Sequence, residues 1–114
     1  MKVIIESLAK KCLDDIFRYN FQYSSKNAIA TDMSIMQNVE NLKIFPYIGR
    51  YIPEMSDRRF REIIYRENRH SGYRIMYYIS QKCNTIYVFN IINSKQDFNY
   101  ILKLHNYFNN YFNF

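Results

Sequence analysis

The residues of this sequence best suited to chemistry are its arginines, which are concentrated in one segment. Seven of the eight arginines fall between positions 50 and 74, together with four acidic residues, whereas the lysines are scattered along the chain. A guanidinium grips a phosphate or a carboxylate with a planar pair of donors, where an ammonium offers only a point charge. The segment therefore predicts a surface that binds an anionic group. Its arginines are Arg50, Arg58, Arg59, Arg61, Arg66, Arg69 and Arg74.

Other residue types that commonly act in catalysis are scarce. Cys12 and Cys83 lack the spacing of a metal-binding motif, and His70 and His105 are far apart in the sequence. We therefore expect no metal ion and no cofactor. Proton transfer near neutral pH normally uses histidine. His70, in a predicted loop, is a minor candidate for that role, and a turn residue without function is the more ordinary interpretation.

Length and charge limit the class of protein. The 114 residues suit a single domain, 1–114, and the net charge of +6 suggests an acidic partner such as nucleic acid, the ribosome or an acidic protein. No apolar run approaches the roughly 18 residues that span a bilayer. The N-terminal apolar stretch is too short for a signal peptide and is interrupted by Glu6. We expect a cytoplasmic protein with no membrane partner.

A helical hairpin is predicted over about residues 8–42. Apolar residues recur at helical spacing over about 8–23 and again over about 27–42, and the polar link between the two helices is short. The stripe predicted to be buried on the second helix consists of Ile29, Met33, Met36, Val39 and Leu42. A short strand over about 2–6, rich in β-branched residues, precedes the hairpin.

A strand meander is predicted over about residues 60–92, with strands at 60–66, 73–80 and 85–92. The segment 45–53 holds both prolines and is interpreted as an ordered loop. A capping-box pattern at 94–97 predicts a C-terminal helix from about residue 95. The order β-α-α-β-β-β-α defines an α+β fold, in which a small twisted, antiparallel-rich sheet packs on the N-terminal helical hairpin.

Several short motifs occur in a characteristic order. They are Leu13-Asp14-Asp15-Ile16, Leu42-x-x-Phe45-Pro46-x-x-Gly49-Arg50, Arg61-Glu62-Ile63, Tyr73-Arg74-Ile75-x-Tyr77 and the run from Ile86 to Ile91. In this series the chain resembles the RelE/ParE superfamily, the toxins of type II toxin–antitoxin systems. The resemblance implies a RelE/ParE-like fold and a growth-arresting toxin that a cognate antitoxin protein neutralises, with an oligomeric toxin–antitoxin complex. Asn93 stands where many members have a histidine, so catalytic sets built on that histidine do not transfer.

The RelE-like branch implies ribosome-dependent cleavage of mRNA, and this is the mechanism that we expect first. Such cleavage transfers a 2′-hydroxyl onto the adjacent phosphate, and arginine stabilises the charge that develops there. The candidate catalytic residues are Arg74, Arg61, Lys95 and Tyr78. Arg58, Arg59, Arg66 and Arg69 are the candidate nucleic-acid-binding residues.

Strand alternation places Tyr73, Ile75, Tyr77 and Ile79 toward the helices and leaves Arg74 with Tyr78 on the opposite, more open face. The register that would relate Arg61 to Arg74 is not determined. Three alternatives stay open. In the first, Arg74 only forms a surface ion pair with Glu62 or Glu67, and Tyr78 is an ordinary sheet residue. In the second, the toxin is a ParE-like poison of DNA gyrase that acts by protein binding, and in the third, the chain is inactive and only binds its antitoxin.

Overall fold

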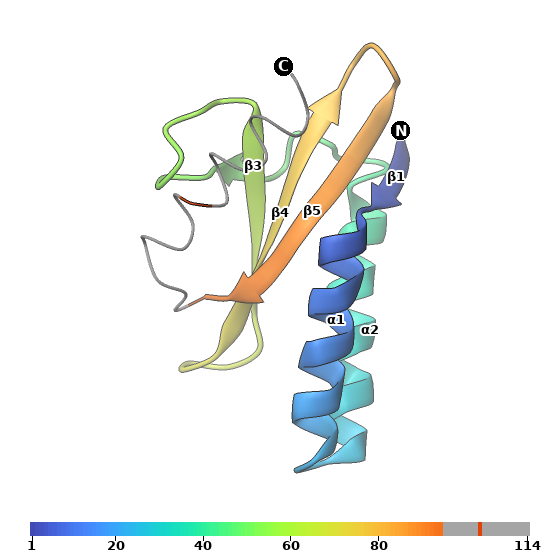
Figure 1. The fold of residues 1–114 in the computed structure, drawn as a ribbon, viewed down its shortest axis with the longest axis vertical. Coiled ribbons are helices and arrows are strands. Elements are labelled where there is room, and N and C mark those ends of the chain that lie inside the picture. The colour runs from blue at the N-terminus through green and yellow to red at the C-terminus, as the bar shows by residue number, and fades with distance from the viewer. Residues whose placement is uncertain (95–102, 104–114) are drawn as a thin grey trace.

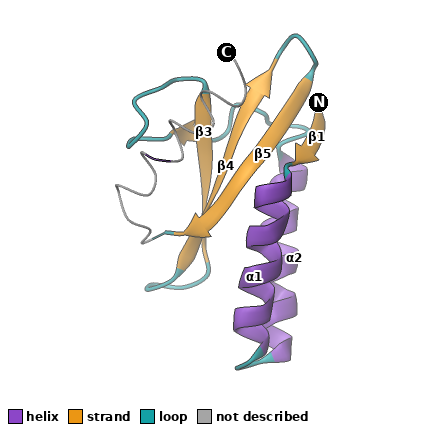
Figure 2. Ribbon diagram, viewed as in Figure 1, coloured by secondary structure: helices purple, strands orange, loops and turns teal. Residues whose placement is uncertain are grey.

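The computed structural model describes residues 1–94 and Lys103. Within them lie two helices, α1 (Ser7–Phe21) and α2 (Ser25–Asn41), and five strands. The strands are β1 (Lys2–Ile5), β2 (Arg50–Tyr51), β3 (Phe60–Arg66), β4 (Gly72–Ser80) and β5 (Thr85–Asn93). The two helices lie side by side as one layer next to the twisted sheet (Figures 1 and 2). The predicted C-terminal helix falls outside the described residues, apart from Lys103, and stays a prediction.

The five strands form one sheet in the order β1-β5-β4-β3-β2. β1 pairs with β5 in parallel, and every other pair is antiparallel. The three predicted strands of the meander are confirmed to within one residue at each end. β2 was not predicted, because two residues inside a loop carry no periodic signal.

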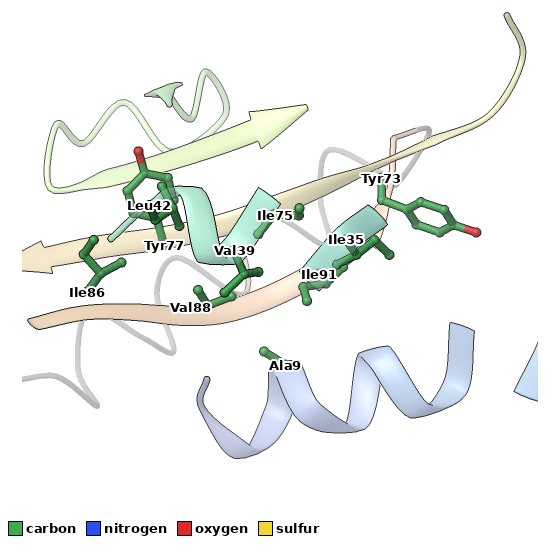
Figure 3. Packing of buried hydrophobic residues seen from close by; sticks show 10 residues of the cluster. All are labelled: Ala9, Ile35, Val39, Leu42, Tyr73, Ile75, Tyr77, Ile86, Val88 and Ile91. Carbon is green, nitrogen blue, oxygen red and sulfur yellow. The ribbon is translucent and has the colours of Figure 1, made fainter. Parts of the chain in front are cut away.

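One face of the sheet packs against the helical hairpin. Tyr73, Ile75 and Tyr77 of β4 lie on this face, as alternation predicted, and Ile79 packs at its edge. Figure 3 shows Tyr73, Ile75 and Tyr77 in one cluster with Ala9 of α1 and side chains from α2 and β5. The other members of this core come from α2, from Leu42 at its C-cap and from β5: Ile35, Val39, Leu42, Ile86, Val88 and Ile91.

The buried face of α2 differs from the predicted stripe. Ile29 and Met33 are 50% and 67% exposed, whereas Ala28 and Thr31 are buried. The predicted stripe and the observed buried face both satisfy helical spacing, and both include Val39 and Leu42. The prediction followed the largest apolar side chains, but small residues at the N-terminal end of α2 are the ones that meet their neighbours. The helix begins at Ser25 because the Ser24 side chain accepts a hydrogen bond from the backbone N–H of Asn27, at 3.1 Å.

The opposite face of the sheet carries a second apolar cluster. Phe60, Met76, Phe89 and Ile92 are buried there beneath residues of the connection between β2 and β3. That connection, residues 52–59, contributes Ile52 and Met55. Both faces of the sheet are therefore covered in the region of β3 and β4. Among the described residues, neither helix is long and apolar enough to cross a membrane.

Candidate functional site

Arg74 lies where strand alternation predicted, on the sheet face away from the helices, but that face is not open around it. The residue is 5% exposed. Its Nε donates to Oε1 of Glu62 at 2.7 Å, and its two terminal nitrogens donate to the two carboxylate oxygens of Glu54, each at 2.6 Å. The expectation of an accessible Arg74 is wrong, because the connection between β2 and β3 lays Glu54 over it.

The Arg74 ion pair is one half of a larger network. Glu62, whose side chain is fully buried, also accepts a hydrogen bond from Nε of Arg50 at 2.8 Å. Hydrogen bonding to Arg74 is the main reason that the pKa of Glu54 lies below its usual value. The pKa of Arg74 is raised, chiefly by its bonds to Glu54. The network ties the connection between β2 and β3 to the sheet and occupies the guanidinium with carboxylates of the chain itself.

Arg61 lies on the other face of the sheet from Arg74. It pairs across β3 and β4 with Tyr77, a residue of the helix-facing core, whereas Arg74 pairs with Ile64. Directly paired residues of antiparallel strands share a face. The two arginines predicted to act on one phosphate are therefore separated by the sheet.

Arg61 is held by backbone and aromatic groups. Its Nη1 donates to the carbonyl of Gly49 at 2.8 Å, and its Nη2 donates to Oη of Tyr51 at 3.3 Å. Its guanidinium carbon lies 4.5 Å from the ring centre of Tyr51 and 5.3 Å from that of Tyr47. Cation–π contacts of this kind fix the orientation of a guanidinium while leaving its charge intact.

A cleft of about 220 Å³ opens beside Arg61, where β3 begins and β4 ends. Its lining residues are Tyr47, Arg58, Arg59, Arg61, Tyr78, Ile79 and Gln81, and we call it the arginine cleft. Arg58 lies with its guanidinium carbon 5.4 Å from the ring centre of Tyr51, and Arg59 forms an ion pair with Asp57. Four of the eight predicted site residues thus meet here: Arg58, Arg59, Arg61 and Tyr78.

One wall of the cleft is the loop between α2 and β2, which Tyr77 fixes from inside the protein. Its hydroxyl donates to the carbonyl of Pro46 and accepts from the backbone N–H of Gly49, both at 2.9 Å. A Cβ at Gly49 would lie 2.5 Å from that hydroxyl oxygen, so the position has no room for a side chain. Gln81 reaches the same loop through a 2.6 Å hydrogen bond to Oη of Tyr47. Tyr47 and Gln81 were not among the predicted site residues.

Tyr78 is poorly suited to accept or relay a proton near neutral pH. Burial is the main cause that raises its pKa to about 12, and neighbouring Tyr87 and Glu6 add to the effect. Its ring stacks on that of Tyr87, with centres 5.1 Å apart. At physiological pH Tyr78 is therefore a neutral phenol in a stacked pair.

The remaining predicted residues do not reach the arginine cleft. Arg66 ends β3, and Arg69 and His70 lie in the exposed turn that leads to β4. Arg61 and Arg66 are five residues apart on one strand, which corresponds to roughly 17 Å. Lys95 lies outside the described residues. Within the part of the chain that is described, no group of histidine, cysteine and acidic side chains could hold a metal ion.

This chain is similar to known proteins in sequence and in fold. The family model described as "ParE toxin of type II toxin-antitoxin system, parDE" matches residues 3–98. Among solved structures, a chain of the "Chromosomal ParDE TA system from P. aeruginosa" aligns with a TM-score of 0.63 and 15% sequence identity, covering 81% of this chain and 94% of that one. At 15% identity, this structural similarity shows only that the two chains share a fold. No curated protein sequence matches the chain. The family match spans most of the chain, which therefore belongs to the ParE toxin family of type II toxin–antitoxin systems.

Proposed function

We propose that this toxin arrests bacterial growth in the cytoplasm by binding and poisoning DNA gyrase, and that a cognate antitoxin protein neutralises it. Membership of the ParE family favours this mechanism over the RelE-like cleavage of mRNA that the arginines first suggested. The observation that carries the choice is the engagement of Arg74 by the carboxylates of Glu54 and Glu62. A guanidinium that is already neutralised inside the fold is not placed to meet a phosphate.

The other members of the predicted catalytic set support the same choice. Arg61 is on the opposite side of the sheet from Arg74, and Tyr78 keeps its proton at neutral pH. His70 lies at the far end of the β3–β4 hairpin from Arg61. The described residues thus bring no histidine near the arginine cleft, whereas transfer of a 2′-hydroxyl proton requires a base within hydrogen-bonding reach. Binding to a protein requires no such group.

Induced expression of the toxin in bacterial cells tests this proposal. We expect growth to stop, plasmid DNA to lose negative supercoils, and a reporter mRNA to remain uncut. Co-expression of the adjacent small open reading frame, which we expect to encode the antitoxin, restores growth. Cuts in the reporter mRNA with normal plasmid supercoiling would contradict this proposal and indicate RelE-like cleavage of mRNA. Normal growth with verified toxin protein would indicate a chain that only binds its antitoxin.

A further inference from the structure

We propose that the arginine cleft and the apolar loop beside it, residues 44–48, form the surface through which the toxin binds its target protein. The segment recognised on the target carries an acidic side chain next to apolar ones. The carboxylate would enter the cleft between Arg58 and Arg61, and the apolar side chains would pack on the loop. This inference rests on the proposed function, because it names the site by which gyrase would be held.

The charge of the cleft is available to a partner. Arg18, Arg50, Arg59 and Arg74 each form an ion pair with an acidic residue of the chain. Among the described residues, no such ion pair joins Arg58 or Arg61 to a carboxylate. Their guanidinium groups contact tyrosine rings and, for Arg61, a backbone carbonyl and a hydroxyl group. An incoming carboxylate would supply the counter-charge that these two arginines lack.

The arginines are also oriented before any partner binds. Tyr51 contacts both guanidinium groups, and Arg61 lies near a second ring, that of Tyr47. Hydrogen bonds from Gln81 and Tyr77 hold the loop that carries Tyr47. Binding energy is therefore not spent on ordering this surface, which is the usual cost of immobilising long side chains at an interface.

The loop beside the cleft exposes apolar side chains that the fold does not use. Ile44, Phe45 and Ile48 are 72%, 59% and 64% exposed, and Tyr47 and Tyr51 next to them are also exposed. A concentration of large apolar side chains on an ordered surface marks an interaction site. Arginine and tyrosine surrounded by apolar area is the composition of protein–protein hot spots.

Several features favour a protein over a nucleic acid at this surface. A nucleic-acid strand requires a row of cations along its phosphates. Here Arg74 is buried, and Arg66 lies roughly 17 Å along β3 from Arg61. Asp57 and Glu62 neutralise two further arginines of the same segment. The accessible charge is therefore a compact pair, which suits one acidic side chain or two.

A separate surface remains for the antitoxin. Tyr19, Phe21, Tyr23 and Ile29 are exposed near the tip of the helical hairpin, and Met33 is exposed at the middle of α2. The loop 44–48 follows the opposite end of α2, whose 17 residues span about 25 Å. Figure 1 shows this tip extending beyond the sheet. A partner on the hairpin tip and a target at the arginine cleft would thus contact different ends of the molecule.

The test compares single substitutions in purified full-length toxin by inhibition of gyrase supercoiling, by growth arrest and by calorimetric binding to the antitoxin. Arg58→Gln, Arg61→Gln and Ile44→Gln alter the proposed surface. Arg18→Gln and Ile29→Gln are matched controls, because they remove an exposed arginine and an exposed isoleucine from the helical hairpin. Thermal unfolding verifies folding, and Arg58 and Ile44 are exposed enough to be changed without loss of the fold.

We expect each of the three surface substitutions to raise the half-inhibitory toxin concentration at least about tenfold, as loss of a hot-spot contact does. The two controls keep wild-type inhibition of gyrase, and the three surface variants keep wild-type antitoxin affinity. Full inhibition and growth arrest by all three surface variants would overturn the inference while leaving the proposed function standing. Loss of antitoxin binding with inhibition intact would also overturn it, by assigning the surface to the antitoxin.

Failure of the proposed function gives a different pattern. A wild-type toxin that arrests growth without inhibiting gyrase would contradict gyrase as the target. In that case the growth assay tests the proposed surface. Weaker growth arrest by Arg58→Gln and Ile44→Gln, with full arrest by the two controls, supports the surface as the contact to another target protein. Unchanged arrest overturns it.

Discussion

Replacing Arg74 with alanine should destabilise the fold rather than remove a catalytic group. The substitution deletes three hydrogen bonds to two carboxylates. Glu62, fully buried, would keep only its contact with Arg50, and Glu54, whose side chain is 16% exposed, would lose both of its bonds. Removing one partner of a buried ion pair typically costs about 3–5 kcal/mol. That is a large part of the roughly 5–15 kcal/mol that stabilises a domain.

Urea denaturation followed by circular dichroism measures this loss. A midpoint lower by more than about 1 M is expected for Arg74→Ala. Arg18→Ala is the control, since its exposed ion pair with Asp14 contributes no more than about 1 kcal/mol. The double variant Arg74→Met, Glu54→Gln should recover part of the loss, because it leaves one fewer uncompensated charge. Wild-type stability of Arg74→Ala together with lost toxicity would refute the structural role and restore Arg74 as a catalytic candidate.

Three further outcomes follow from the loop and the ion-pair network. Gly49→Ala should cost about 1–3 kcal/mol in urea denaturation, because its Cβ would lie 2.5 Å from the Tyr77 hydroxyl and 2.7 Å from the Glu62 carbonyl oxygen. Tyr77→Phe should cost about 1–3 kcal/mol in the same assay, because it leaves the buried N–H of Gly49 unpaired, and a wild-type midpoint would disprove that role. The lowered pKa of Glu54 gives stability that is present above the ordinary pKa of 4.5 and lost as the pH falls through the lower folded value. The urea midpoint should therefore drop on acidification below about pH 4.5, and an equal drop in Glu54→Gln would contradict this assignment.

Local patterns were enough to predict most elements of the fold. Enrichment in Ile, Val, Tyr and Phe between short polar loops identified β3, β4 and β5, and alternation assigned the helix-facing side of β4 correctly. The buried face of α2 was predicted wrongly at its N-terminal half, because Ala28 and Thr31 carry little hydrophobic signal. Burial of a small residue depends on which neighbour approaches it, and the sequence of one helix does not contain that information.

The site was harder to predict, because it depends on contacts between distant segments. The burial of Arg74 results from Glu54, 20 residues earlier in the chain, which folds over β4 from the connection between β2 and β3. The separation of Arg61 from Arg74 depends on strand register, which alternation within a single strand does not determine. Tyr47 and Gln81 join the cleft through contacts across 34 residues. Arg58, Arg59 and Arg61, three members of the arginine cluster found in the sequence, line one cleft in the structure.

We propose that this ParE-family toxin acts on gyrase as a protein-binding poison. The most direct measurement incubates the purified toxin with DNA gyrase and relaxed plasmid, and in parallel with translating ribosomes and a reporter mRNA. We predict that supercoiling is inhibited in proportion to toxin, that equimolar antitoxin reverses the inhibition, and that the mRNA stays intact. Undiminished supercoiling together with ribosome-dependent cuts in the mRNA would contradict the claim.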